Sequence, residues 1–90
     1  MVRKAAEQND PSGQLLLGNS YRKGEGVATD YVEAYAWYSM AAKAYESAAK
    51  GRDLLETMMT KQQIADAQRR TGELRAERDA RLNKLKRGGK

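Results

Sequence analysis

The chain has 90 residues, of which 40% are hydrophobic and 32% are charged, with one proline, no cysteine and no histidine. A chain of this length forms at most one domain. Without cysteine or histidine it can form no disulfide, no thiolate zinc site and no Ser-His or Cys-His nucleophile pair. We therefore expect a helical protein that is not an enzyme, with no catalytic residues and no bound metal or cofactor.

The net charge of +5 is concentrated at the C-terminal end of the chain. Residues 1–60 carry seven basic and eight acidic side chains, whereas residues 61–90 carry ten basic and four acidic side chains. No stretch has the roughly 18 consecutive apolar residues of a membrane-spanning helix, and residues 1–10 lack the apolar run of a signal peptide. We expect no membrane insertion and a cytoplasmic location, with secretion left open if the N-terminus is truncated.

Helical periodicity runs through almost the whole chain, and no segment alternates as a strand does. The first predicted helix has Asp10 as its N-cap and Pro11 in its first turn. It extends to about Lys23, because glycines 24 and 26 tolerate the positive φ angles that end a helix.

A second helix is predicted to begin at Asp30, with Thr29 as the competing N-cap. Its apolar residues follow helical spacing and predict one stripe that packs on other helices: Tyr31, Ala34, Trp37, Tyr38, Ala41, Ala42 and Tyr45. Tyr35 lies at the flank of this stripe, so its ring is expected to be the most exposed. A third helix covers roughly residues 47–58, although Gly51 inside it is unfavourable.

Thr60 and Gln63 form a capping box that opens the longest predicted helix, which extends to about residue 86. Gly72 could end it, but two correctly oriented i,i+4 ion pairs favour continuation. These pairs are Asp66 with Arg70 and Glu77 with Arg81. A continuous helix would be roughly 40 Å long and would overhang the other three.

The pattern of residues 3–8 recurs at residues 39–44, an offset of 36 residues that is typical of helical repeats. Between them lies a longer motif: Gln14, Leu17, Gly18, Tyr21, Gly24, Gly26, Val27, Asp30, Ala34, Trp37, Tyr38, Ala41 and Ala42. The motif closely resembles a Sel-one-like repeat, a relative of the tetratricopeptide repeat. Residues 59–68 resemble the segment that often closes such arrays.

This resemblance implies an all-α fold, a short α/α solenoid of helix pairs with a long C-terminal helix. It implies a role in protein-protein contact, of the adaptor or scaffold type, and no catalytic residues. We expect the solenoid over residues 1–59, a capping or extension helix over 60–87 and a disordered tail at 88–90. The small linker glycine usual after the Ala41-Ala42 pair is missing, which leaves open whether the second and third helices merge.

One complete repeat with two partial neighbours leaves an unsatisfied end, because repeats bury their cores against each other. The chain is therefore expected either to be a fragment of a longer array or to self-associate, through this open end, through a leucine stripe or through both. A homodimer is the expected form of self-association. The candidate residues form an imperfect heptad stripe on the fourth helix: Leu74, Leu82 and Leu85.

Two further surfaces are candidates for binding. A protein partner of unknown identity could dock on Leu15, Asn19 and Arg22, which we expect on the face of the first helix opposite Leu17, together with Tyr35. Alternatively, the basic helix could bind nucleic acid or an acidic membrane surface. The residues for that alternative are Arg69, Arg70, Arg75, Arg78 and Arg81. Acidic residues interrupt this run, so the interaction module is the favoured prediction.

Overall fold

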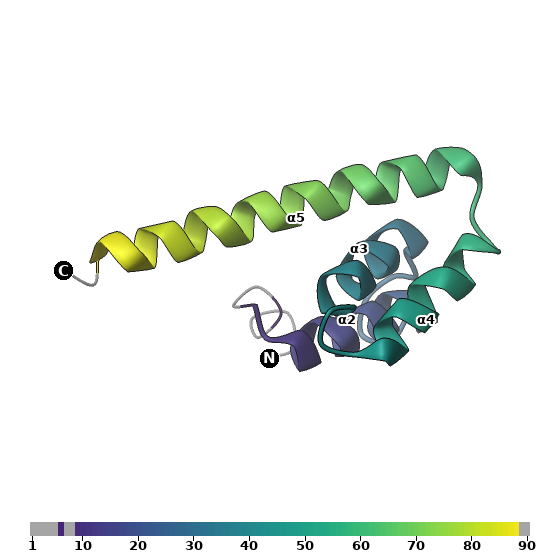
Figure 1. Cartoon of the computed structure of the whole chain (residues 1–90). Helices are drawn as coiled ribbons and strands as arrows, with labels where there is room; N and C mark the ends of the chain where they lie inside the picture. The colour runs from purple at the N-terminus through teal and green to yellow at the C-terminus, as the bar shows by residue number, and fades with distance from the viewer. Residues whose placement is uncertain (1–5, 7–8, 89–90) are drawn as a thin grey trace.

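The computed structural model describes residue 6 and residues 9–88, with side chains up to residue 84. The described residues contain four α-helices, α2 to α5, and no strand (Figure 1). They are α2 (Pro11–Lys23), α3 (Tyr31–Ala41), α4 (Glu46–Glu56) and α5 (Lys61–Gly88). The predicted all-helical class is confirmed. Apart from Ala6, residues 3–8, which the sequence matches to residues 39–44, lie outside the described residues, as do residues 89 and 90.

Side-chain caps start three of the helices. The Asp10 carboxylate accepts hydrogen bonds from the backbone N–H and the hydroxyl of Ser12, and these bonds lower the pKa of Asp10. Asp30 caps α3 by accepting from the backbone N–H of Glu33 at 3.2 Å, which decides between Asp30 and Thr29. The capping box at the start of α5 is confirmed, since Thr60 and Gln63 exchange hydrogen bonds of 2.9 and 3.1 Å.

The second and third helices do not merge. The carbonyl oxygen of Ala41 accepts hydrogen bonds from the backbone N–H groups of Ala44 and Tyr45, both at 3.0 Å, and this turn ends α3. By contrast, α5 continues through Gly72 without a break, as the sequence predicts. The turn around residues 41–45 thus joins α3 to α4 without the linker glycine that is usual in such repeats.

Helix α3 forms the centre of the molecule and packs against α2, α4 and α5. Its buried residues surround the helix: Ala34, Tyr35, Ala36, Trp37, Tyr38, Ser39 and Ala41. The prediction of a single apolar stripe is therefore wrong, and so is the predicted exposure of Tyr35, whose side chain is buried. Alanines on several sides of α3 let three helices approach it. Tyr45, the last member of the predicted stripe, lies beyond the end of α3 and is exposed.

The ring of Tyr38 lies between two glycines from different helices. A Cβ atom built on Gly18 of α2 would lie 2.6 Å from Cδ1 of this ring, and one built on Gly51 of α4 would lie 2.9 Å from Cε2. Both distances are shorter than carbon atoms allow. The close approach of α2 and α4 to α3 therefore requires glycine at both positions, which explains Gly51 inside a helix.

Helix α5 lies across α3 and extends beyond it (Figure 1). Its buried side chains Ala67 and Leu74 pack into the two hydrophobic clusters around α3. Arg70 Nε donates to Glu33 of α3 at 2.7 Å, and this hydrogen bond raises the pKa of Arg70. The predicted pairing of Arg70 with Asp66 is wrong, because Asp66 pairs with Arg69 while Arg70 turns toward α3.

The 28 residues of α5 correspond to about 42 Å of helix, against molecular dimensions of 47, 25 and 24 Å. The long axis of the molecule is therefore that of α5, and the predicted overhang is confirmed. We call residues 82–88 the overhang, because they follow Arg81, the last residue to line a cavity shared with α3.

Replacing Gly18 with alanine tests the packing of Tyr38. We expect Gly18→Ala to lower the free energy of unfolding by about 1–3 kcal/mol, because the new methyl group would displace a buried ring. Gly72→Ala is the matched control: this helical glycine has open space around it, and alanine should stabilise the protein by about 0.5–1 kcal/mol. Urea denaturation followed by circular dichroism measures both, and equal effects of the two substitutions would contradict the packing argument.

Candidate functional site

The predicted partner face on α2 is largely used inside the molecule. Arg22 Nε donates to the Tyr38 hydroxyl at 2.9 Å, and this hydroxyl donates to Asn19 Oδ1 at 2.5 Å. Leu15 is half-buried against the cluster that contains Tyr38. The expectation that these residues point away from the core is therefore wrong, and they do not form a free groove.

The error lies in the rotation assigned to α2. Leu16 is 52% exposed and marks the solvent side. Since successive helical residues are about 100° apart, Leu15 and Leu17 lie on its two flanks, while Gln14 and Gly18 face the core. Leu16 was missed as a surface residue because three consecutive leucines give no unique direction for an apolar face.

Tyr35 is bound to α4 rather than free for a partner. Its hydroxyl donates to Glu56 at 2.7 Å. Burial raises the pKa of Tyr35 above its ordinary value, and the hydrogen bond to the Glu56 carboxylate raises this pKa further. The structure therefore places Tyr35 at the contact between α3 and α4, where it joins the two helices.

The structure separates the three leucines of the predicted self-association stripe. Leu74 is 5% exposed and belongs to the cluster of Trp37, so it is not available at the surface. Leu82 is 43% exposed at the start of the overhang. The side chain of Leu85 lies outside the described residues. Leu74 turns inward because α5 still covers α3 at that point, whereas Leu82 is two turns further along.

The five arginines of the basic alternative do not share one free stripe. Three are paired with carboxylates: Arg69 with Asp66, Arg70 with Glu33 and Arg78 with Asp79. Arg75 lines a polar cleft between α4 and α5, and Arg81 lines a small cavity beside Trp37. Their side chains therefore point in several directions around α5.

Two exposed apolar residues at the C-terminal end of α4 and just beyond it form a surface that the sequence did not indicate. Leu54 is 55% exposed, and Met58, just after the helix, is 49% exposed, whereas Leu55 and Met59 are buried. We call Leu54 and Met58 the α4 patch. Its i,i+4 spacing is visible in the sequence, but the adjacent Leu55 and Met59 have the same spacing, so the pattern alone does not decide which pair is buried.

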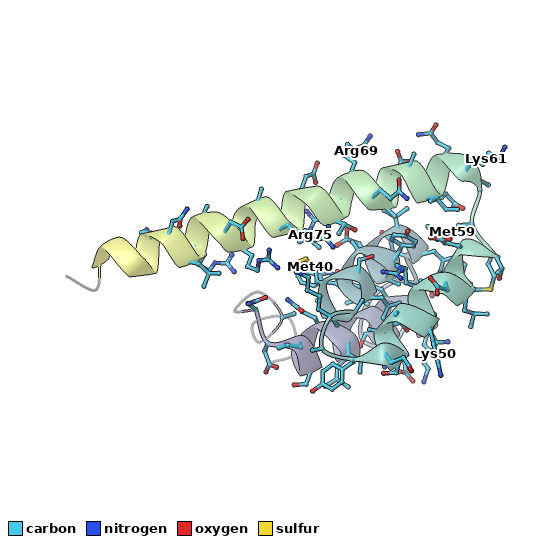
Figure 2. All side chains as sticks on the ribbon, in the orientation of Figure 1. Met40, Lys50, Met59, Lys61, Arg69 and Arg75 are labelled. Carbon is cyan, nitrogen blue, oxygen red and sulfur yellow. The ribbon has the colours of Figure 1, made fainter. Side chains whose placement is uncertain are left out.

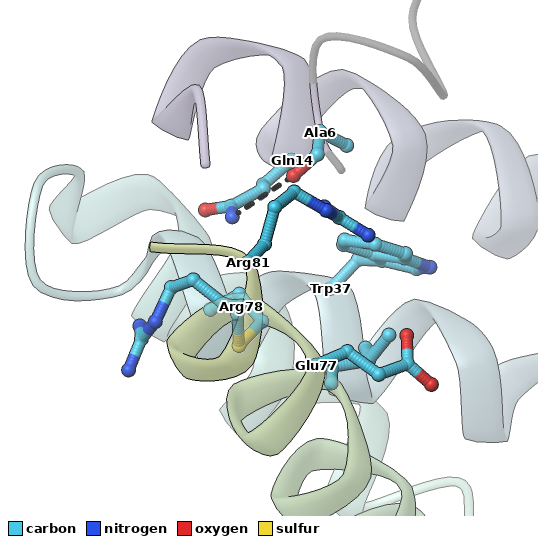
Figure 3. Close-up of a pocket in the computed structure, with 8 residues that line it drawn as sticks. Ala6, Gln14, Trp37, Glu77, Arg78 and Arg81 are labelled. Carbon is cyan, nitrogen blue, oxygen red and sulfur yellow. Dashed lines mark hydrogen bonds between the residues drawn. The ribbon is translucent and has the colours of Figure 1, made fainter. Parts of the chain in front are cut away.

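A small cavity lies where α5 leaves the body of the molecule (Figure 3). It is lined by Gln14 of α2, Trp37 of α3 and Glu77, Arg78 and Arg81 of α5. Its volume of about 10 Å³ is at the lower limit for holding one water molecule. Gln14 Nε2 donates to the carbonyl oxygen of Ala6 at 3.3 Å, which ties the start of α2 to the preceding segment.

No protein-family model and no curated protein matches this chain. No helix in the described part of the chain is long and apolar enough to cross a membrane. Since neither comparison found a match, the resemblance to the Sel-one-like repeat remains a prediction that depends on the motif residues themselves.

The raised pKa of Tyr35 predicts a loss of stability in alkaline solution. The folded protein holds the Tyr35 proton more tightly than the unfolded chain does, so this contribution is fully present below about pH 10 and is lost as pH rises through the folded pKa. We expect the free energy of unfolding to fall more steeply between about pH 9 and about pH 11 in the wild type than in Tyr35→Phe.

Urea denaturation at intervals across this range measures the two slopes. Tyr45→Phe is the matched control, because Tyr45 is exposed and has no place in the buried clusters. Parallel curves for the wild type and Tyr35→Phe would show that the Tyr35 hydroxyl does not couple folding to alkaline pH.

Proposed function

We propose that the chain is a non-catalytic protein-interaction module of the helical-repeat type and that it self-associates. The α2–α3 hairpin supports the repeat assignment, because motif residues occupy its key positions. Gly18 lies against Tyr38, Gly24 ends α2 with a φ of 75°, and Asp30 caps α3. In this proposal α2 and α3 form the complete repeat of a short solenoid, and α4 with the first half of α5 forms the partial one.

The main observation in support of self-association is that Leu82 is exposed on the part of α5 that extends beyond the other helices. Leu82 is 43% exposed at the start of the overhang, so covering it with a second surface gains about 1 kcal/mol, the exposed share of the free energy of burying a whole leucine. The α4 patch offers such a surface, with two large apolar side chains about one helical turn apart.

Charge favours contact between the overhang of one copy and α4 of the other. The overhang carries three basic side chains, Lys84, Lys86 and Arg87, and no acidic one. Helix α4 carries three acidic and two basic side chains. Two overhangs lying side by side would repel each other, whereas a reciprocal contact of overhang with α4 brings opposite net charges together. The same contact made twice gives a twofold dimer.

Light scattering at tens of micromolar tests this proposal. We expect a mass of twice 10.1 kDa for the wild type. Leu82→Glu and Leu54→Glu should each weaken the dimer by about tenfold or more, since each removes a buried leucine and adds a charge. Leu16→Glu is the matched control, because Leu16 is also about half exposed but lies on α2, away from the proposed contact.

The response to salt distinguishes the proposed geometry from a contact between two overhangs. Raising NaCl from about 50 mM to about 500 mM should weaken a contact between opposite charges and strengthen one between like charges. A monomeric mass under all conditions would refute self-association. Steep, salt-sensitive retention on heparin that disappears on deleting residues 73–90 would instead support the nucleic-acid alternative.

A further inference from the structure

A polar cleft opens between α4 and α5, with α3 as its floor. It is lined by Tyr35 and Ser39 of α3, Arg52 of α4, and Gln68, Thr71 and Arg75 of α5. Helices α4 and α5 both pack on α3 but contact each other little, which leaves the space between them open. Figure 2 shows Arg75 at the side of α5 that faces the other helices. The cleft is separate from both the α4 patch and the overhang.

The two arginines bring positive charge to the cleft from opposite walls. Arg75 has no ion pair with any carboxylate among the described residues. Within the described part of the chain, the ion pair of Arg52 is with its neighbour Asp53 at 3.3 Å, and the Asp53 side chain is 67% exposed. An exposed pair of this kind contributes little free energy, so the Arg52 guanidinium can exchange it for another anion.

Two carboxylates of α4 lie near the cleft, and each has a partner of its own. Neither Asp53 nor Glu56 lines the cleft, and the Glu56 carboxylate already accepts a hydrogen bond from the Tyr35 hydroxyl. The remaining hydroxyls also have partners for their protons: Ser39 donates to the Tyr35 carbonyl oxygen, and Thr71 donates to the Ala67 carbonyl oxygen. The Gln68 amide already donates a hydrogen bond to the Tyr35 hydroxyl. The hydrogen-bond donors left to meet a ligand are therefore the guanidinium groups and the second amide N–H of Gln68.

The volume of the cleft limits what it can hold. It measures about 200 Å³, room for about six or seven water molecules and less than the roughly 300 Å³ at which pockets for drug-sized ligands begin. Its buried lining side chains, Tyr35, Ser39 and Thr71, all carry a hydroxyl group. Such a cleft suits a small polar group together with ordered water and offers no apolar anchor for a larger molecule.

We propose that this cleft binds a single oxyanion, a phosphate or a carboxylate group, held between the guanidinium groups of Arg52 and Arg75. Guanidinium donors match the paired oxygens of both groups, and hydrogen bonds between ionised partners are the stronger kind. Gln68 supplies a neutral donor from the α5 wall. This site does not depend on the proposed self-association.

The test is a nuclear magnetic resonance titration of the full chain that follows the arginine Nε–H signals. Inorganic phosphate is added in one series and acetate in another, with NaCl adjusted to keep the ionic strength constant. We expect saturable shifts of the Arg52 and Arg75 signals. Saturation by phosphate alone identifies a phosphate site, and saturation by both anions identifies a general oxyanion site.

Two variants make the titration specific. Arg75→Gln should weaken binding by about tenfold, because it removes charged donors from one wall of the cleft. Arg69→Gln removes the same charge from the exposed side of α5, where Arg69 pairs with Asp66, and should leave the affinity unchanged. Amide signals from the core report that each variant is folded. The proposal is overturned if neither anion gives saturable shifts or if both variants lose affinity equally.

Discussion

The fold depends on the contact of one tyrosine ring with two glycines. Tyr38 lies on the central helix α3, and its ring fills the space that a side chain would take at Gly18 and at Gly51. Its hydroxyl also joins Asn19 and Arg22 of α2 by hydrogen bonds. A single buried side chain therefore sets how closely α2 and α4 approach α3. The hydroxyl, which is the only polar group of this side chain, is hydrogen-bonded at the edge of the hydrophobic cluster.

The position of α5 is determined by a different set of contacts. Helix α3 uses one side for α2, another for α4 and a third for α5, and Arg70 binds Glu33 across the α3–α5 contact. Because α4 and α5 meet α3 rather than each other, a polar cleft remains between them. Because α5 is longer than the body is wide, its last turns reach beyond the body with Leu82 exposed. Both proposed binding surfaces follow from this arrangement around α3.

Local features of the fold were predictable from the sequence. Caps act within four residues, so Asp30 and the pair of Thr60 and Gln63 could be identified without knowing the rest of the fold. The direction in which individual side chains point, toward the core or toward solvent, was not predictable. The solvent-facing side of α2 and the burial of Tyr35 both depend on which helices surround α3. Helical periodicity in the sequence does not specify how many helices pack against a given helix. Neither arginine of the proposed oxyanion site stood out for this role, because Arg52 and Arg75 are 23 residues apart.

The sequence by itself determined four helical segments, most of their ends, and the separation of a nearly neutral body from a basic C-terminal helix, because these properties are local or additive. Only the tertiary structure decided which side chains remain at the surface. Leu74 and Leu82 share one helix and one apolar character, yet the first is buried against α3 and the second is exposed. The difference arises because burial depends on where a neighbouring helix ends, and that endpoint is set by the packing of other segments.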